Sequence, residues 1–173
     1  MKIYLFATLL FINAIQVFSK DIIYIQNKKQ AKCLLDYEYK NVFIYFDYSC
    51  PICMAYRQKI AEILVRTGDS INVNIVFTPM TDTTEIFTYS DFKNSSAKFI
   101  YDTNFILSKR LKVNVVPTVI IFRNNKKVYM GKFDDRYSSI VDDKMNIIQD
   151  YVEDVLFLNK KHDENEALGC KFR

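Results

Sequence analysis

Two cysteines separated by only two residues, Cys50 and Cys53, are the feature of this sequence that most directly suggests chemistry. They lie between the aromatic and β-branched run 41–48, which predicts a strand, and the amphipathic stretch 51–66, which predicts a helix. A helix N-terminus presents unpaired N–H groups and the positive end of the macrodipole, so it stabilises a thiolate on Cys50. Cys53 follows one turn later and can either pair with Cys50 or resolve a mixed disulfide that Cys50 has formed. Pro51 suits the first helical turn, which needs no N–H at that position.

The same cysteine pair also occurs in zinc sites and as unreactive buried sulfur. A structural zinc site needs four ligands, usually from a second cysteine pair or from paired histidines. The chain has one histidine, His162, in a polar stretch, and its other cysteines, Cys33 and Cys170, are isolated. We therefore expect no metal site.

A second constellation is Val116-Pro117-Thr118, at the start of an apolar run. Proline inside a strand removes a ladder hydrogen bond, so its place here needs a reason. Taken alone, a trans proline that begins a strand is the commoner explanation, because only about 5–6% of such bonds are cis. Its position after the cysteine pair favours a cis bond that exposes the Val116 backbone for pairing with an extended substrate.

The N-terminus has the pattern of a secretory leader, with Lys2, an apolar centre and cleavage expected after Ser19. A retained anchor is the alternative, but the apolar run is short of the ~20 residues that span a bilayer. We therefore expect an extracytoplasmic protein, periplasmic or secreted, with no membrane span after cleavage. Export favours a redox pair over unreactive sulfur, because disulfides persist in oxidising compartments.

Length and charge limit the remaining possibilities. The chain has 173 residues and a net charge of +4 with both signs interspersed, which fits one domain and gives no basic surface for nucleic acid. We assign 1–19 to the signal peptide, 20–158 to the domain and 159–173 to a polar C-terminal tail. We also expect a monomer.

Hydrophobic periodicity predicts a mixed sheet with helices on both faces, an α/β fold. The expected irregular segment, 80–102, holds one or two short helices. Strands are expected at 21–26, 41–48, 71–79, 114–122 and in a hairpin over 123–133, and helices at 27–40, 51–66, 103–113 and about 141–158.

Together these features resemble the thioredoxin superfamily, in particular its exported redoxin branch of thiol-disulfide and thiol-specific-antioxidant-like proteins. The resemblance covers about residues 21–173. It rests on CPxCxxY (Cys50 to Tyr56), on Asp102 ahead of a helix, on the proline motif, on YxGxxDD (Tyr129 to Asp135) and on a terminal Gly169-Cys170-x-Phe172.

The resemblance implies a thioredoxin-like three-layer fold, a central mixed sheet flanked by helices, with an insertion before the cis-proline strand. It implies an exported thiol-disulfide oxidoreductase without cofactor, whose partners are protein thiols or disulfides and an upstream redox protein. Cys50 would be the nucleophile, Cys53 the resolving thiol and Val116, Pro117 and Thr118 the substrate-binding loop. Asp134 and Asp135 are expected in a turn and a helix cap rather than as catalytic acids.

The sequence departs from thioredoxins at two positions near the cysteines. Ser49 replaces the usual tryptophan, and Ile44 replaces the buried acid that accepts the proton of the inner thiol. Asp47 is in the wrong alternation phase to replace that acid. We expect a reduction potential between about −270 and −180 mV. A peroxidase is not expected, because Phe43 and Asp47 stand where its proline and threonine would be.

Cys33 and Cys170 are left over if Cys50 pairs with Cys53. A second disulfide between them is one expectation, and a mobile Cys170 thiol that exchanges with the cysteine pair or with a partner is the other. The competing function is a non-catalytic binding module that keeps the cysteines for partner capture or for copper or another soft metal.

Overall fold

The structure is a computed structural model that describes residues 22–35, 40–88, 92, 95–136 and 149–172. The expected leader, 1–19, and the first part of the expected closing helix, 141–148, lie outside the described residues. Among the helices of this part of the chain, none has the length and apolar character that crossing a membrane requires.

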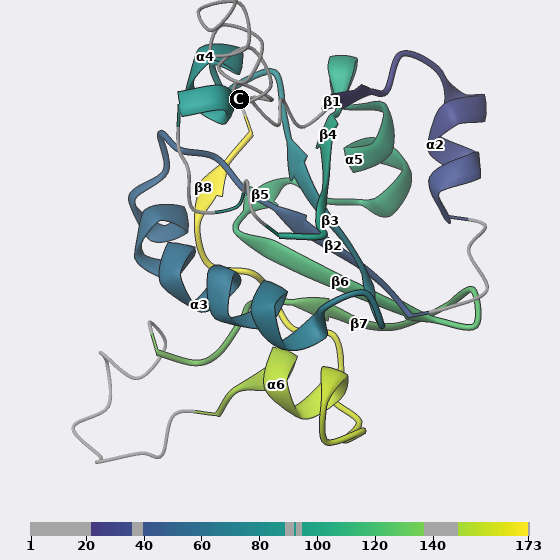
Figure 1. The fold of residues 1–173 in the computed structure, drawn as a ribbon, viewed down its shortest axis with the longest axis vertical. Coiled ribbons are helices and arrows are strands. Elements are labelled where there is room, and N and C mark those ends of the chain that lie inside the picture. The colour runs from purple at the N-terminus through teal and green to yellow at the C-terminus, as the bar shows by residue number, and fades with distance from the viewer. Residues whose placement is uncertain (1–21, 36–39, 89–91, 93–94, 137–148, 173) are drawn as a thin grey trace, which may run out of the picture.

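A six-stranded mixed sheet forms the centre of the molecule (Figure 1). Four strands run parallel, and the hairpin β6–β7 continues the sheet in antiparallel fashion from β2. The strands are, in spatial order, β1 (Ile22–Tyr24), β4 (Lys98–Tyr101), β3 (Asn72–Phe77), β2 (Asn41–Tyr45), β6 (Thr118–Arg123) and β7 (Lys126–Gly131). The expected α/β fold class with a mixed sheet is confirmed.

One strand of this sheet lies where the sequence predicts irregular structure. β4 comes from the segment 80–102 and sits between β1 and β3, paired in parallel with both. It follows a stretch rich in Thr, Asp and Ser, whose composition predicts a loop rather than a strand. The segment also contains the expected short helix, α4 (Thr83–Thr88).

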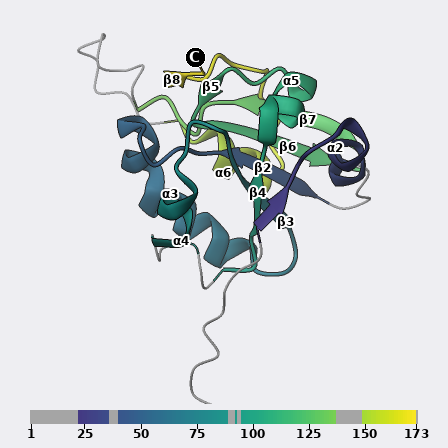
Figure 2. The same ribbon diagram turned by 90° about the horizontal axis from the view of Figure 1, so that it is seen from above.

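Two helix pairs flank the sheet (Figures 1 and 2). In one pair α3 (Pro51–Thr67) lies beside α6 (Tyr151–Leu156), where Arg66 forms an ion pair with Glu153 and stacks on the ring of Phe157. In the other, α2 (Lys28–Leu35) contacts α5 (Ile106–Leu111), which follows the short 3₁₀ turn η1 (Thr103–Phe105). The pattern of the sequence thus indicated a helix at each of these four places. The expected closing helix, about 141–158, is shorter than predicted in its described part, because Gln149 and Asp150 are not helical and α6 begins at Tyr151, with Asp150 as its N-cap.

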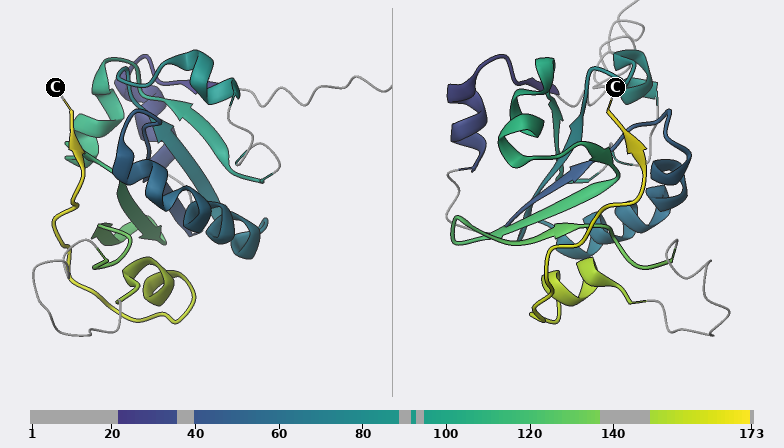
Figure 3. Two further views of the ribbon diagram at one scale, coloured as in Figure 1. Left: turned by 90° about the vertical axis from the view of Figure 1, so that its left-hand side faces the viewer. Right: turned by 180° about the vertical axis from the view of Figure 1, so that it is seen from behind.

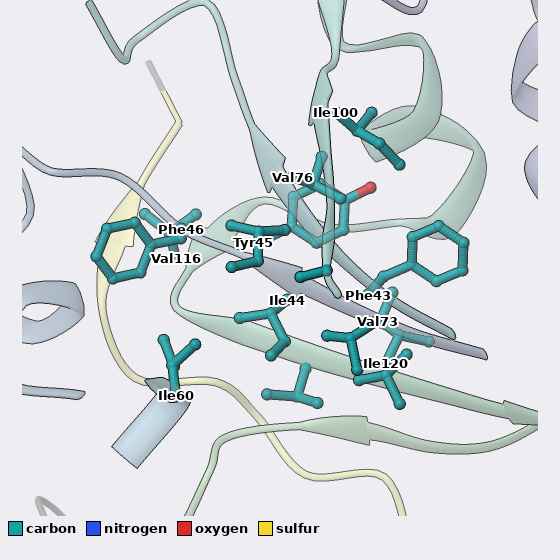
Figure 4. Close-up of a cluster of buried hydrophobic side chains, with 14 of the residues drawn as sticks. Phe43, Ile44, Tyr45, Phe46, Ile60, Val73, Val76, Ile100, Val116 and Ile120 are labelled. Atoms are coloured by element: carbon teal, nitrogen blue, oxygen red, sulfur yellow. The ribbon is translucent and has the colours of Figure 1, made fainter. Parts of the chain in front are cut away.

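The core is built around β2, whose five residues are all buried (Figure 4). Phe43 and Tyr45 fill one side of the strand, while Ile44 lies on the other side, toward α3, which carries Ile60. Burying aromatic and β-branched side chains on both faces of a central strand makes β2 a rigid support. The segment that leaves β2 at Tyr45 is therefore held firmly where it reaches the cysteines.

The C-terminal tail, residues 159–172, returns along the domain as an extended segment (Figure 3). It ends in β8 (Cys170–Lys171), which pairs antiparallel with β5 (Val115–Val116) as a separate two-stranded sheet. The sequence predicts a polar tail without such a strand. The pairing brings the last cysteine to the loop that carries the proline motif.

Candidate redox site

Helix α3 positions Cys50 at its N-terminus. Cys50 is the N-cap residue, with extended backbone angles, and Pro51 occupies the first helical turn without any side-chain cap. The Cys50 N–H donates to the Asp47 carbonyl oxygen at 3.2 Å, which closes the turn between β2 and α3. The sulfur therefore lies beside unpaired N–H groups at the positive end of a 17-residue helix. This is the environment that the sequence predicts for a nucleophilic cysteine.

The proline loop lies directly against this cysteine. The Val116–Pro117 bond is cis, as expected. The Cys50 Sγ is 3.6 Å from the Val116 carbonyl oxygen, and the buried Thr118 hydroxyl donates to the Val115 carbonyl at 2.7 Å. The fold thus brings together residues that are 66 positions apart in the chain.

The disulfide of this structure joins Cys50 to Cys170, with their Cα atoms 6.0 Å apart. This differs from the expected pairings, because Cys170 is not bonded to Cys33 and Cys53 is a free thiol. The reason is the strand pairing: Cys170 lies opposite Val116 in the β5–β8 register, which puts its side chain next to Cys50. The other expectation was a mobile Cys170 thiol. The structure instead holds Cys170 in a bond with Cys50, one of the two cysteines with which that thiol was expected to exchange.

Cys53 is buried in the first turns of α3. The pKa of its thiol is raised to about 12. Burial is the main cause, the charge of Asp47 adds to it, and a hydrogen bond from the Asp47 backbone opposes it. Cys53 is therefore protonated at neutral pH. Since the thiolate is the attacking species, Cys53 needs a proton acceptor before it can resolve a disulfide.

Asp47 is the acidic residue whose alternation phase in the sequence argued against a role as proton acceptor for the inner thiol. It is buried, with 1% of its surface exposed, and its carboxylate accepts hydrogen bonds of 2.9 Å from both the Ser49 N–H and the Ser49 hydroxyl. Strand alternation does not apply to it, because β2 ends at Tyr45 and Asp47 lies in the following turn. Its charge acts on the Cys53 thiol and raises the pKa of that thiol. Ile44, at the usual position of the acid, is wholly buried in the core.

The remaining motif residues support the site from a distance. The buried Asp102 accepts hydrogen bonds from the Leu107 and Ser108 N–H groups, both at 2.7 Å, and so holds the start of α5, which precedes the proline loop. Asp134 accepts from the Tyr56 hydroxyl and from Lys59, both at 2.6 Å, and Lys59 also pairs with Asp150 at 2.5 Å. These contacts give the CPxCxxY and YxGxxDD motifs a structural explanation.

Burial alone would raise the pKa of Asp134, but hydrogen bonds from Lys59 and Tyr56 and the charge of Lys59 outweigh it and lower the pKa. Asp134 is thus a charged anchor between α3 and the chain that leads to α6. Asp135 accepts from the Gln149 N–H at 2.8 Å, so the expected turn contacts are present, while Asp150 is the residue that caps α6.

Within the described part of the chain, no group of three or more histidine, cysteine, aspartate or glutamate side chains could hold a metal ion. The copper or soft-metal alternative therefore has no ligand cluster among these residues. The sulfur chemistry of Cys50, Cys53 and Cys170 is what the arrangement offers.

Comparisons with known proteins place the fold. No protein-family model and no curated protein matches the chain. An uncharacterized conserved protein from Geobacillus kaustophilus superposes with a TM-score of 0.58 at 16% identity, covering 78% of this chain and 76% of that one. A hypothetical protein from Sinorhizobium meliloti gives 0.55 at 15% identity, covering 81% of each chain.

A secreted disulfide oxidoreductase from Mycobacterium tuberculosis, homologous to E. coli DsbE, gives a TM-score of 0.46 at 14% identity over 52% of this chain and 66% of that one. Likeness at these identities concerns the fold and leaves the activity open. The six-stranded mixed sheet, its flanking helices, the cysteine pair at the start of α3 and the cis-proline beside it are the features of the fold that the resemblance in the sequence implies. The chain has a thioredoxin-like fold.

Proposed function

We propose that this protein is an exported thiol-disulfide oxidoreductase that exchanges disulfides with protein thiols through Cys50 and Cys53. The observation that carries the proposal is the Cys50–Cys170 bond itself. An extended segment pairs with the backbone of Val115 and Val116, and a cysteine in that segment reaches Cys50. A substrate segment with the same backbone geometry would present its sulfur in the same way.

The reaction proceeds in two exchanges. The Cys50 thiolate attacks one sulfur of a partner disulfide, and the other partner sulfur leaves as a thiolate. Cys53 then gives up its proton, attacks the Cys50 Sγ and releases the second partner thiol, so that two electrons pass from the protein to its partner. An upstream redox protein returns the Cys50–Cys53 disulfide to two thiols. With a partner that is a dithiol, the same steps run in reverse.

Asp47 is the proton acceptor that we propose for Cys53. Its carboxylate is buried and held in place by Ser49, and its charge acts on the pKa of the Cys53 thiol. A buried base at this point replaces the acid that thioredoxins carry at the position of Ile44. Asp47 acts as the base while a mixed disulfide occupies Cys50, because that is the step in which Cys53 must lose its proton.

Export is part of the proposal and is supported by the leader pattern of 1–19 and by a disulfide that an oxidising compartment would preserve. We further propose that the protein acts as a monomer and needs no cofactor.

Insulin reduction by dithiothreitol, followed as turbidity, tests the activity. The wild-type chain should accelerate the precipitation of insulin, and Cys50→Ser should reduce the rate to that of dithiothreitol alone. Cys33→Ser is the matched control, which keeps the wild-type rate. Equal rates for wild type and Cys50→Ser would refute the enzyme and leave the non-catalytic binding module.

A further inference from the structure

The tail fits the site through several separate contacts besides the disulfide. Asn165 anchors its middle, donating its N–H to the Met130 carbonyl at 3.1 Å and accepting from the Lys132 N–H at 2.9 Å. At its end, the Phe172 N–H donates to the Asn114 carbonyl at 2.9 Å. The Phe172 ring packs on Phe105, with centroids 5.4 Å apart. A segment that rested on the surface by chance would not be held at both ends of its cysteine.

Gly169 shows how closely the tail approaches the proline loop. A Cβ atom at this position would lie 1.8 Å from the Val116 carbonyl oxygen and 3.1 Å from the Pro117 Cδ. Real Cβ atoms do not come so near to a backbone oxygen, so only glycine allows this approach. The Gly-Cys-x-Phe ending is therefore fitted to the edge formed by Val115 and Val116, which we call the β5 edge.

The tail also occupies the β5 edge and Cys50, both of which the proposed substrate needs. A strand edge pairs with one partner at a time, and the β5 edge is paired with Cys170 and Lys171. In this state Cys50 is only 1% exposed, whereas Cys170 is partly exposed. A substrate segment can reach Cys50 in the same geometry only after the tail has left.

We propose that Cys170 is a third redox-active cysteine, and that the tail is a tethered competitor of protein substrates for Cys50 and the β5 edge. The inference rests on the proposed function, because it concerns the same site.

The exchange that closes the site is balanced within the chain. Starting from a Cys50–Cys53 disulfide, the Cys170 thiolate attacks the Cys50 Sγ, the bond to Cys53 breaks, and Cys53 takes up the proton that Cys170 had lost. No electrons enter or leave the protein. The product has Cys53 as a buried neutral thiol, which is the form that burial favours.

The site opens by exchange with an external protein dithiol. One of its thiolates attacks the more exposed Cys170 Sγ, and Cys50 leaves as a thiolate stabilised by the N-terminus of α3. The second thiol of the partner then attacks the mixed disulfide, forms the partner's disulfide and releases Cys170 as a thiol. Two electrons have passed from the partner to the protein, and the β5 edge is free.

The connection of the tail to the domain determines how strongly Cys170 competes with an external peptide for Cys50. A short linker gives its end an effective concentration in the millimolar range. An external peptide at about 10 μM is therefore outcompeted roughly 100-fold unless the tail is detached. Removing the fit of the tail should raise the rate at which such a peptide reaches Cys50 by about this factor.

Disulfide mapping tests the linkage directly. The mature chain is equilibrated with oxidised glutathione, its free thiols are blocked at low pH, and the linked peptides are identified by mass spectrometry. Wild type and Cys33→Ser should both show Cys50 linked to Cys170, and Cys170→Ser should show Cys50 linked to Cys53. A wild-type linkage of Cys50 to Cys53 with Cys170 alkylated, or of Cys33 to Cys170, would overturn the inference.

The second measurement is the rate at which a synthetic, unstructured peptide containing one cysteine, at about 10 μM, forms a mixed disulfide with Cys50 of the oxidised protein, the bonded cysteine being identified by mass spectrometry. Gly169→Ala should react about 100-fold faster than wild type, because its added Cβ keeps the tail off the β5 edge. Leu168→Ala changes an exposed side chain of the same tail and should behave as wild type. Phe172→Ala, which leaves the backbone near Val116 unchanged, should act in the direction of Gly169→Ala.

Equal rates for Gly169→Ala, Phe172→Ala and wild type would overturn the inference even if insulin reduction depends on Cys50. Loss of that dependence would instead refute the proposed function. The two failures are therefore distinguishable.

Discussion

The three sulfur atoms of the site differ in their surroundings, and this difference assigns their roles. Cys50 lies at the N-terminus of α3, Cys53 is buried and is affected by the charge of Asp47, and Cys170 is partly exposed to solvent. The spacing of Cys50 and Cys53 was enough to predict the first two as a pair. Nothing in the local sequence of Cys170 predicts its partner, because that partner depends on a strand pairing between segments far apart in the chain.

The high pKa of Cys53 gives a prediction for the oxidised Cys33→Ser protein, in which Cys53 is the remaining thiol. With a pKa of about 12, ionisation alone should make its alkylation by iodoacetamide at pH 7 on the order of a thousandfold slower than that of a free cysteine. The rate should rise about tenfold for each pH unit between pH 7 and 9, because the thiolate fraction does so below the pKa. Mass spectrometry of the alkylated peptide gives the rate.

Asp47→Asn separates the charge of Asp47 from its proposed action as a base. Removing the charge lowers the pKa of Cys53 and should speed alkylation, whereas losing the base should slow insulin reduction. If the rate of Cys53 alkylation levelled off near pH 8 in the protein that keeps Asp47, the high pKa assigned to Cys53 would be contradicted.

At the scale of elements, the predictability of the fold varied with the composition of the sequence around each element. The helix over 51–66 and the hairpin over 123–133 were located from periodicity and from Asn124-Asn125, which adopt the positive φ angles that a tight turn needs. β4 and β8 were missed because they follow polar stretches whose composition predicts loops, whereas β1, with only three residues, was located within an apolar run. The Gly-Cys dipeptide was the one available signal of a close approach by the tail, and it could be interpreted only once Val116 was placed.

Asp134 links α3 to the end of β7, so its replacement should change the stability of the fold. Asp134→Asn should reduce the free energy of unfolding at pH 7 by about 2–3 kcal/mol, because Tyr56 and Lys59 lose a charged acceptor that ties α3 to the end of β7. Urea unfolding at several pH values measures this difference.

The pH dependence of that difference follows from the lowered pKa of Asp134. A carboxylate with a depressed pKa contributes stability that is complete above its unfolded value of about 3.9 and is lost as the pH falls through the folded value. The wild-type advantage over Asp134→Asn should therefore shrink below about pH 4. Asp163→Asn, an exposed carboxylate in the tail, should change stability by less than about 0.5 kcal/mol.

At the scale of the whole molecule, the Cys50–Cys170 bond links the start of the redox helix to the end of the chain, 120 residues later. It thereby closes the chain from Cys50 to Cys170 into one loop, with β1, α2 and β2 outside it. Thiol exchange at this bond opens or closes the loop as well as the access to Cys50. The redox state and the stability of the fold should therefore be coupled.

This coupling predicts the stability of the oxidised forms. In the chain-entropy account, closing a loop of 120 residues stabilises the folded state by about 5 kcal/mol, against about 2 kcal/mol for the four-residue loop between Cys50 and Cys53. Oxidised wild type should therefore unfold at a higher urea concentration than oxidised Cys170→Ser, with the reduced proteins unfolding nearly together. An equal effect of oxidation on both proteins would show that the linkage in solution is the short one.

The measurement that most directly tests the central claim is the trapping of a mixed disulfide. Reduced Cys53→Ser/Cys170→Ser lacks both thiols that can release a partner, so incubation with insulin should leave an insulin chain bonded to Cys50, identifiable by mass spectrometry. In Cys53→Ser alone, Cys170 should displace the insulin chain and yield the Cys50–Cys170 disulfide. The absence of an adduct on Cys50 in the double variant, or an adduct on Cys33 instead, would contradict thiol-disulfide exchange at this site.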